Sequence, residues 1–173
     1  GNTEYLINWE NNGERLKNSK ANLRSPHLYF KNGITWNALT SSKTSARLSN
    51  YGAIFDSAGS SMFPEDTNYY LSLMNTKVTF NLLQLLNPTL NYGAGTVANL
   101  PNKYSYNNLK AISCLTQQNI DIAKEEWDSR ETSWDFETLY LAKGDSIESA
   151  YNDYCNHWRD NFVTMHKNEE ELN

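Results

Sequence analysis

The stretch from residue 68 to residue 86 constrains the fold most, because its apolar residues recur at intervals of three and four. This spacing places them on one side of a helix. Asn87-Pro88 ends the pattern, because the residue before a proline leaves the α-region and proline has no N–H to donate. We therefore predict one central helix, with an apolar stripe formed by Leu71, Met74, Val78, Leu82, Leu85 and Leu86.

Strand-like segments precede this helix, and helical patterns follow it. Turn-forming residues such as Asn11-Asn12-Gly13 and Lys31-Asn32-Gly33 separate the predicted strands at residues 4–10, 34–39, 44–48 and 53–57. Downstream, residues 120–130 read as helical. Apolar and aromatic residues at helical spacing predict a long helix over 147–165, with Asp145 or Ser146 as its N-cap.

These patterns predict an α+β fold. We expect a small twisted, mostly antiparallel sheet packed on the central helix, followed by a helical C-terminal arm. The large apolar side chains expected in the core are Trp36, Phe55, Phe63 and Leu82.

Length and composition bound the class of protein. A chain of 173 residues with 39% apolar residues can hold one sizeable core. Two cysteines are too few for a disulfide framework, and no apolar run approaches the roughly 20 residues that span a bilayer. We therefore expect a cytoplasmic location and no membrane partner. The helical pattern still continues at the last residues, which predicts a fragment of a longer protein.

The net charge of −5 hides a division between two parts of the chain. Residues 1–111 carry ten Lys and Arg against six Asp and Glu, a net charge of +4. Residues 112–173 carry five against fourteen, a net charge of −9. This asymmetry predicts a basic functional domain over 1–111 and an acidic helical arm over 112–173. A long exposed helix is charged in any protein. Charge alone therefore does not distinguish an acidic arm on a basic functional domain from an ordinary solvent-exposed helix.

The sequence predicts no catalytic, cofactor or metal site in this chain. Cys155 and His157 point in different directions on a helix, so they cannot share one metal ion. The stretch from Asn87 to Gly95 imitates two methyltransferase motifs, but its Asn-Pro is followed by Thr89-Leu90 rather than by proline and an aromatic residue. Its glycines follow a helix and lead to a short predicted strand, whereas a cofactor loop follows a strand.

Contact with nucleic acid is the more plausible chemistry. Hydroxyl groups and two cations fall within residues 40–47, and such groups bind phosphate oxygens and base edges. An asparagine, a tyrosine and a lysine further along the chain could join them. A polar hairpin with no ligand is the alternative, and composition alone favours it. The predicted DNA-contacting residues are Ser41, Ser42, Lys43 and Arg47, followed by Asn91, Tyr92 and Lys103.

Several stretches, taken together and in order, resemble one protein family. They are NWENNG at 8–13, YFKNGITW at 29–36, TSSK at 40–43 with Arg47, GAIFDSAGSSMFP at 52–64, LSLMNTKV at 71–78, LLNPTLN at 85–91 and WDSRETSWDF at 127–136. The set resembles the region behind the catalytic domain of large bacterial adenine-specific DNA methyltransferases. The nearest are PglX-type enzymes of phage-defence (BREX) systems and related type II restriction–modification methylases.

The resemblance implies a target recognition domain that reads double-stranded DNA for an N6-adenine methyltransferase. S-adenosylmethionine and the catalytic motif would then belong to a separate methyltransferase domain of the same protein, and the C-terminal helix would begin a helical spacer. Because the net charge is negative, we expect the isolated chain to bind DNA weakly. The alternative function is a protein-interaction or scaffolding module, in which the 147–165 helix packs on a partner or forms a dimer.

Overall fold

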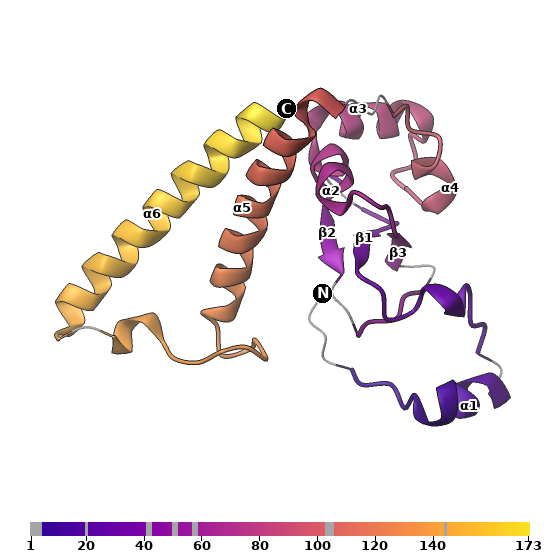
Figure 1. Ribbon diagram of the computed structural model, residues 1–173, viewed down its shortest axis with the longest axis horizontal. Helices are drawn as coiled ribbons and strands as arrows, with labels where there is room; N and C mark the ends of the chain where they lie inside the picture. Colours follow the sequence, from indigo (N-terminus) through magenta and orange to yellow (C-terminus); the bar gives the residue numbers. More distant parts are fainter. Residues whose placement is uncertain are drawn as a thin grey trace.

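The computed structural model describes residues 5–19, 21–40, 43–49, 52–56, 59–102, 106–143 and 145–173, with the side chain of Tyr106 excepted. Figure 1 shows a small α+β body from which a long helical hairpin projects, in agreement with the predicted class. The helices of the described residues are α1 (Glu10–Asn18), α2 (Thr67–Asn75), α3 (Lys77–Leu86), α4 (Ala94–Val97), α5 (Leu109–Asp128) and α6 (Ile147–Leu172). The strands are β1 (Gly33–Asn37), β2 (Ala46–Ser49) and β3 (Gly59–Met62), and the short 3-10 helices are η1 (Pro26–Leu28), η2 (Tyr106–Asn108) and η3 (Tyr140–Ala142).

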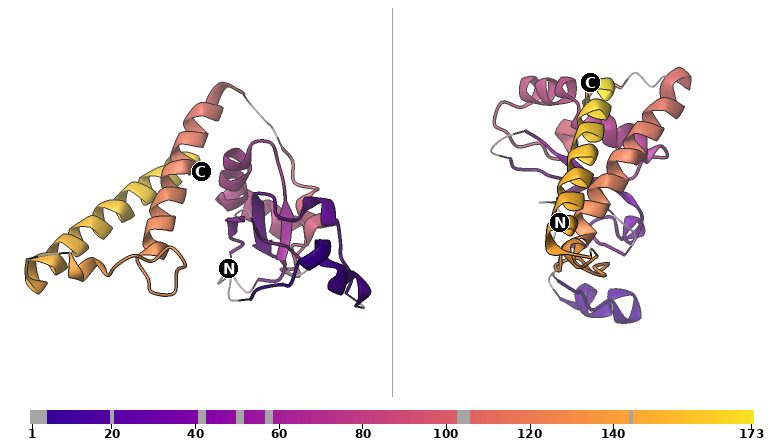
Figure 2. Two further views of the ribbon diagram at one scale, coloured as in Figure 1. Left: turned by 60° about the horizontal axis from the view of Figure 1, so that its bottom comes forward. Right: turned by 90° about the vertical axis from the view of Figure 1, so that its left-hand side faces the viewer.

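The sheet has β1 at its centre, with β2 and β3 paired antiparallel on either side. Successive side chains of a strand point to opposite faces. Ile34 and Trp36 of β1 therefore point to one face, where they are fully buried against Leu71 and Met74 of α2. α2 contacts both β1 and β2, and Figure 2 shows the body and the projecting helices from two further sides. The predicted antiparallel sheet on a helix is confirmed.

The strand predicted at 53–57 is wrong in position. The described residues 53–56 form no strand, and β3 begins at Gly59 instead. At the start of β3, the backbone N–H of Gly59 donates to Asp56 Oδ1 at 2.9 Å. The strand predicted at 4–10 is wrong too, because residues 5–9 have no strand to pair with and remain largely exposed.

The central helix is interrupted, contrary to the prediction of one continuous helix. Thr76 adopts an extended backbone (φ −73°, ψ 152°) between α2 and α3. Its hydroxyl group accepts a hydrogen bond from the backbone N–H of Thr79 at 3.1 Å and donates to the carbonyl oxygen of Leu73 at 2.9 Å. Thr76 is thus an N-cap, a role that favours threonine over most residues. α3 ends at Leu86, directly before Asn87-Pro88, as predicted.

This interruption divides the predicted apolar stripe. Leu71 and Met74 are buried in α2, whereas Val78, Leu85 and Leu86 of α3 are exposed and Leu82 is half-buried. Leu83, outside the predicted stripe, is fully buried instead.

Two further predictions, on the core residues and on a strand after Gly93, are only partly correct or wrong. Of the other side chains expected in the core, Trp36 is buried, while Phe55 and Phe63 are only half-buried. After Gly93 the chain forms α4, a single helical turn, and not the predicted short strand.

α5 and α6 form the projecting hairpin. The end of the hairpin opposite the connecting loop, where α5 begins and α6 ends, is attached to the body. α5 packs on α2, where the Asn68 amide donates to the carbonyl oxygen of Ser113 at 3.3 Å. α6 begins at the predicted N-cap Ser146, whose hydroxyl oxygen accepts from the Ser149 N–H. At the far end of α6, Asn173 Oδ1 accepts from the backbone N–H of Lys77 at 2.8 Å. α5 runs unbroken through residue 111, and the division of the chain into two domains there stays a prediction.

Polar side chains link α5 to α6. Asn168 is buried, and its amide donates to Gln118 Oε1 at 3.2 Å and to Asn119 Oδ1 at 2.9 Å. Among the described residues, no helix is both long enough and apolar enough to cross a bilayer.

Candidate nucleic-acid interface

The face of the sheet opposite α2 is polar. The register places Arg47 of β2 and Ser61 of β3 on either side of Thr35, and Gly59 beside Asn37. These five residues alternate with the buried positions of their strands, so they share the second face. We call them the outer face. All five are half-buried or exposed, and hydroxyl, amide and guanidinium groups dominate their chemistry.

Arg47 is held in place on this face. Its Nη2 donates to Asn37 Oδ1 at 3.0 Å, which draws the guanidinium group from β2 across to β1. Among the described residues its Nε is buried without a hydrogen-bond acceptor. A guanidinium group offers five N–H donors in a planar fork. The buried Nε cannot reach a ligand, but the Nη donors that do not bond Asn37 are left for one, such as a phosphate or a guanine edge.

The chain beyond β1 pairs with a segment that is distant in sequence. The N–H of Thr40 donates to the carbonyl oxygen of Leu90 at 3.3 Å, and the N–H of Tyr92 donates to that of Ala38 at 2.6 Å. Leu39 and Asn91 face each other between these two bonds. The structure therefore places Asn91 beside the chain that leaves β1, next to Thr40.

Of the seven predicted DNA-contacting residues, the structure describes four. Lys43 and Asn91 are exposed, and Arg47 is half-buried on the outer face. Tyr92 is wrong as a surface contact, because none of its surface is exposed. The remaining three lie outside the described residues: Ser41, Ser42 and Lys103.

Tyr92 is buried because it follows Asn91 in an extended segment, so the two side chains point in opposite directions. Its carbonyl oxygen accepts a hydrogen bond from the indole Nε1 of Trp36 at 2.7 Å, inside the core. Its own hydroxyl group is buried without a hydrogen-bond partner among the described residues. Tyr92 thus anchors the segment rather than touching a ligand.

Two exposed residues of this region escaped the sequence analysis. Asn37 was available from the alternation along β1, because it follows the buried Trp36. Leu39, 74% exposed, had no local signal, because its pairing with Asn91 depends on the tertiary fold.

The loop between α3 and the outer face does not fit a methyl-donor cofactor. The Asn87 amide donates to the carbonyl oxygen of Asn91 at 2.7 Å, and Asn87 Oδ1 accepts from both the N–H and the hydroxyl group of Thr89. This asparagine therefore stabilises its own loop. Gly93 is the N-cap of the single turn of α4 and Gly95 lies within that turn, and an isolated bridge at Asn91 rather than a strand precedes them.

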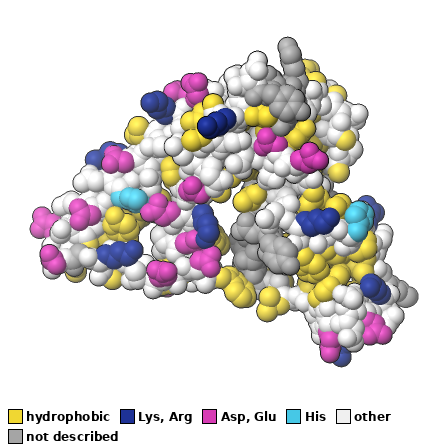
Figure 3. Space-filling view, viewed as in Figure 1, with side chains coloured by type: hydrophobic (Ala, Val, Ile, Leu, Met, Phe, Trp, Pro, Cys, Tyr) yellow, Lys and Arg dark blue, Asp and Glu magenta, His cyan; other side chains and the backbone are white. Residues whose placement is uncertain are grey.

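Charge separates the hairpin from the body. Figure 3 shows acidic side chains gathered on the α5–α6 hairpin. Asp128 forms an ion pair with Lys124 and accepts a hydrogen bond from the Ser133 hydroxyl group. Both hold the pKa of its carboxyl group below the usual range, and the Lys124 bond is the larger cause. The bonds of Lys124 to Asp128 and, at 2.9 Å, to Asp135 raise the pKa of its ammonium group. Lys124 is therefore paired with acids of the hairpin itself.

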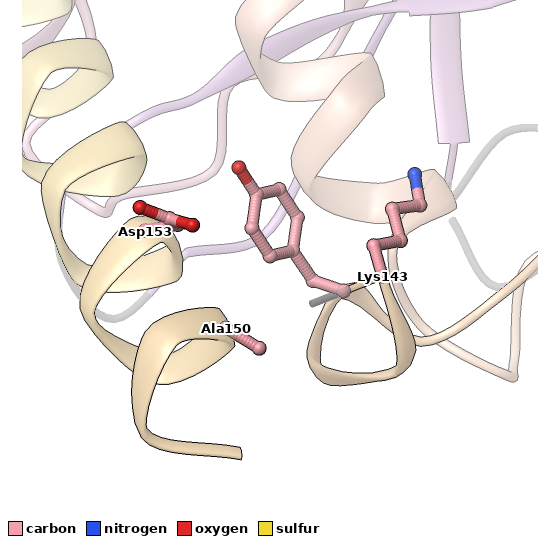
Figure 4. A pocket seen from close by; sticks show the side chains of 4 residues that line it. Lys143, Ala150 and Asp153 are labelled. Atoms are coloured by element: carbon pink, nitrogen blue, oxygen red, sulfur yellow. The ribbon is translucent and has the colours of Figure 1, made fainter. Parts of the chain in front are cut away.

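A second cluster lies where η3 meets α6. His157 Nε2 lies 2.8 Å from Glu125 Oε1, and the His157 ring stacks on Tyr140 with ring centroids 5.5 Å apart. Beside it is a pocket of about 220 Å³, lined by Tyr140, Lys143, Ala150 and Asp153. Figure 4 shows Lys143 and Asp153 on opposite sides of this pocket. Within the described part of the chain, no group of three or more His, Cys, Asp or Glu side chains could hold a metal ion.

Two known adenine-specific methyltransferases are similar to this chain in sequence. No protein-family model matches the chain. The chain is 34% identical, over an alignment of 191 residues that covers all of it, to the adenine-specific methyltransferase PglX of Lacticaseibacillus casei (strain Zhang). Over 163 residues, covering 90% of it, the chain is 37% identical to the adenine-specific methyltransferase BrxX of Escherichia coli O9:H4 (strain HS). It spans only 16% and 13% of the length of these two relatives. Along its whole length the chain is thus related to one region of the PglX-type adenine-specific methyltransferases.

Proposed function

We propose that this chain is the target recognition region of an N6-adenine DNA methyltransferase in a phage-defence or restriction–modification system. The observation that carries the proposal is the similarity of the whole chain to one region of two adenine-specific methyltransferases. An enzyme that modifies adenine at defined sites needs a surface that reads the neighbouring base pairs. The outer face and the adjoining Leu39–Asn91 bridge are the surface we assign to that task.

The outer face has the chemistry that such reading needs. Arg47 can donate two parallel hydrogen bonds to O6 and N7 of guanine, and the Asn37 amide holds its fork in position. The exposed Lys43 ammonium group suits a phosphate, which positions the protein without reading sequence. The two segments paired at the Leu39–Asn91 bridge are as narrow as a two-stranded β-ribbon, which can enter the major groove.

Methyl transfer would then take place in another domain of the enzyme. The loop at residues 87–95 does not fit S-adenosylmethionine, so the cofactor and the reacting groups belong to a methyltransferase domain outside this chain. The chain's own role is to bind and orient the duplex. Because its acidic residues are concentrated in residues 112–173, we expect the α5–α6 hairpin to point away from the phosphates.

A gel-shift titration tests this assignment. The full 173-residue chain is titrated with duplex DNA at several salt concentrations, as wild type and as the Arg47→Ala and Lys43→Ala variants. Arg47→Ala should weaken binding of a preferred sequence about tenfold. Lys43→Ala should weaken binding of all sequences alike and lower the slope of log affinity against log salt by about one.

Arg159 provides a matched control, because it also donates from its guanidinium group to an asparagine, Asn156 Oδ1, at 3.1 Å. It lies on α6, far from the outer face in the chain and on the acidic hairpin. Arg159→Ala should leave the affinity unchanged. Equal effects of Arg47→Ala and Arg159→Ala would show that the contribution of Arg47 is general charge and not a specific contact.

α6 supports a second candidate function. Its outward side exposes apolar residues, among them Ile147 at 81% and Phe162 at 67%. Exposed apolar side chains are typical of contacts between proteins where they form one patch. We propose that this side packs on another part of the methyltransferase polypeptide, as a structural arm. Sedimentation of the isolated chain tests the alternative occupant: a dimer that Phe162→Glu dissociates would assign this side to self-association instead.

A further inference from the structure

Leu39 and Asn91 form an exposed pair beside the outer face. They are directly opposite each other in an antiparallel bridge. The flanking bonds join Thr40 to Leu90 and Tyr92 to Ala38, so Leu39 and Asn91 do not bond each other through their backbones. This is the arrangement in which facing side chains come closest, with Cα atoms about 4.5 Å apart. Both side chains project from the same side of the bridge.

The pair points to solvent. Tyr92, which follows Asn91, is buried in the core, so Asn91 points the other way. Leu39 is 74% exposed, and Asn91 is exposed as well. Among the described residues, the side-chain amide of Asn91 makes no hydrogen bond; its backbone carbonyl oxygen accepts from Asn87. The amide therefore keeps its donor and its acceptor for a ligand.

The backbone that carries the pair is fixed from three directions. The two bridge bonds hold it to the end of β1, and Asn87 holds the carbonyl oxygen of Asn91. Trp36, 1% exposed, donates to the carbonyl oxygen of Tyr92 from within the core. A pre-ordered pair loses little conformational entropy when it binds, which favours sequence-specific recognition of a base pair over non-specific contact with DNA.

We propose that Leu39 and Asn91 together read an A·T base pair in the major groove. A side-chain amide pairs with adenine by accepting from N6 and donating to N7. The apolar leucine side chain fits the C5-methyl group of thymine, the one apolar group that the major groove displays. An amide and an apolar side chain next to each other therefore match the two halves of one A·T pair. This inference rests on the proposed function, because it names a base pair that the DNA-binding surface recognises.

The test begins with selection of bound sequences from a random duplex library by the full 173-residue chain at low salt. Binding to the selected duplex is then measured by fluorescence anisotropy after two single-atom or single-group changes. Replacing thymine with uracil removes the C5-methyl group, and replacing adenine with 7-deazaadenine removes the N7 acceptor. The protein variants are Leu39→Ala and Asn91→Ala, with Leu85→Ala as control, because Leu85 is an equally exposed leucine on α3.

The wild-type chain should lose about fourfold in affinity on uracil at one position of the selected site. It should lose about tenfold on 7-deazaadenine at the paired position. Leu39→Ala should become insensitive to uracil, and Asn91→Ala insensitive to 7-deazaadenine, while Leu85→Ala behaves like wild type.

Two other outcomes separate the inference from the function on which it rests. If a sequence is selected and both variants respond to the altered bases as wild type does, the pair does not read DNA and another part of the surface does. If no sequence is enriched and no duplex binds, the proposed function itself is contradicted, and this inference with it.

Discussion

Replacing Trp36 with phenylalanine should destabilise the fold by about 3 kcal/mol, and the structure supplies both parts of this magnitude. The indole Nε1 donates to the carbonyl oxygen of Tyr92 at 2.7 Å in the core. Without it, a buried carbonyl oxygen loses its partner, which costs roughly 1–3 kcal/mol. The smaller ring also leaves a cavity beside Ile34 and Met74, which costs about 1 kcal/mol more.

Tyr92→Phe is the matched variant, and its effect should have the opposite sign. The Tyr92 hydroxyl group is buried without a hydrogen-bond partner among the described residues. Removing it keeps the ring packing and relieves the desolvation of one polar group, so stability should rise by about 1 kcal/mol.

Urea denaturation followed by circular dichroism measures both changes, with the slope of unfolding free energy against urea as a check that the unfolded state is the same. At a slope of about 2 kcal/mol/M, the two midpoints should differ by about 2 M. A Trp36→Phe variant within about 0.5 kcal/mol of wild type would contradict the reasoning. So would a Tyr92→Phe variant that unfolds more easily than wild type.

Three further predictions concern the supports of the sheet, the helix break and the hairpin. Asn75→Ala should cost about 2 kcal/mol in urea denaturation, because the Asn75 amide bonds both the N–H and the carbonyl oxygen of Ala46 at the edge of β2. Thr76→Ala should lower stability by about 1 kcal/mol in the same assay, because it removes the N-cap of α3, whereas Thr76→Ser should restore it. The lowered pKa of Asp128 means that its stabilisation is present above the usual carboxyl pKa and is lost as the pH falls through the folded pKa. Lys124→Met should therefore move the Asp128 pKa up toward the usual range in an NMR titration of its carboxyl carbon.

Regular local patterns predicted part of the fold. The alternation around Trp36 and the turn residues on either side predicted β1, because a half-buried strand imposes a period of two. The aromatic residues of α6 recur at helical spacing over many turns, and Ser146 is a strong N-cap, so the helix and its start were predictable. Its end was not, because α6 runs to Leu172, beyond the predicted residue 165.

The predictions failed where tertiary contacts, and not local sequence patterns, determine the secondary structure. Apolar periodicity continues across Thr76, and only the capping bond of its hydroxyl group shows that the helix stops there. β3 is built mainly from glycine and serine, which have little intrinsic preference for strands, so its place depends on pairing with β1.

The residues of the candidate site were likewise only partly predictable from the sequence. Arg47 and Lys43 could be chosen by residue type, since cations near hydroxyl groups suit phosphates and base edges. Asn91 and Tyr92 could not be told apart until the bridge to Leu39 showed which of them points to solvent. That pairing joins distant parts of the chain, and no local pattern carries it.

The central claim is that duplex DNA binds the outer face and the Leu39–Asn91 bridge, and amide NMR tests it most directly. The ¹⁵N-labelled chain is titrated with a short duplex that carries its selected sequence. We predict that the signals of Asn37, Leu39, Arg47 and Asn91 shift together, while those of α6 stay unchanged. Shifts confined to the α5–α6 hairpin, or no shifts at saturating duplex, would contradict the claim.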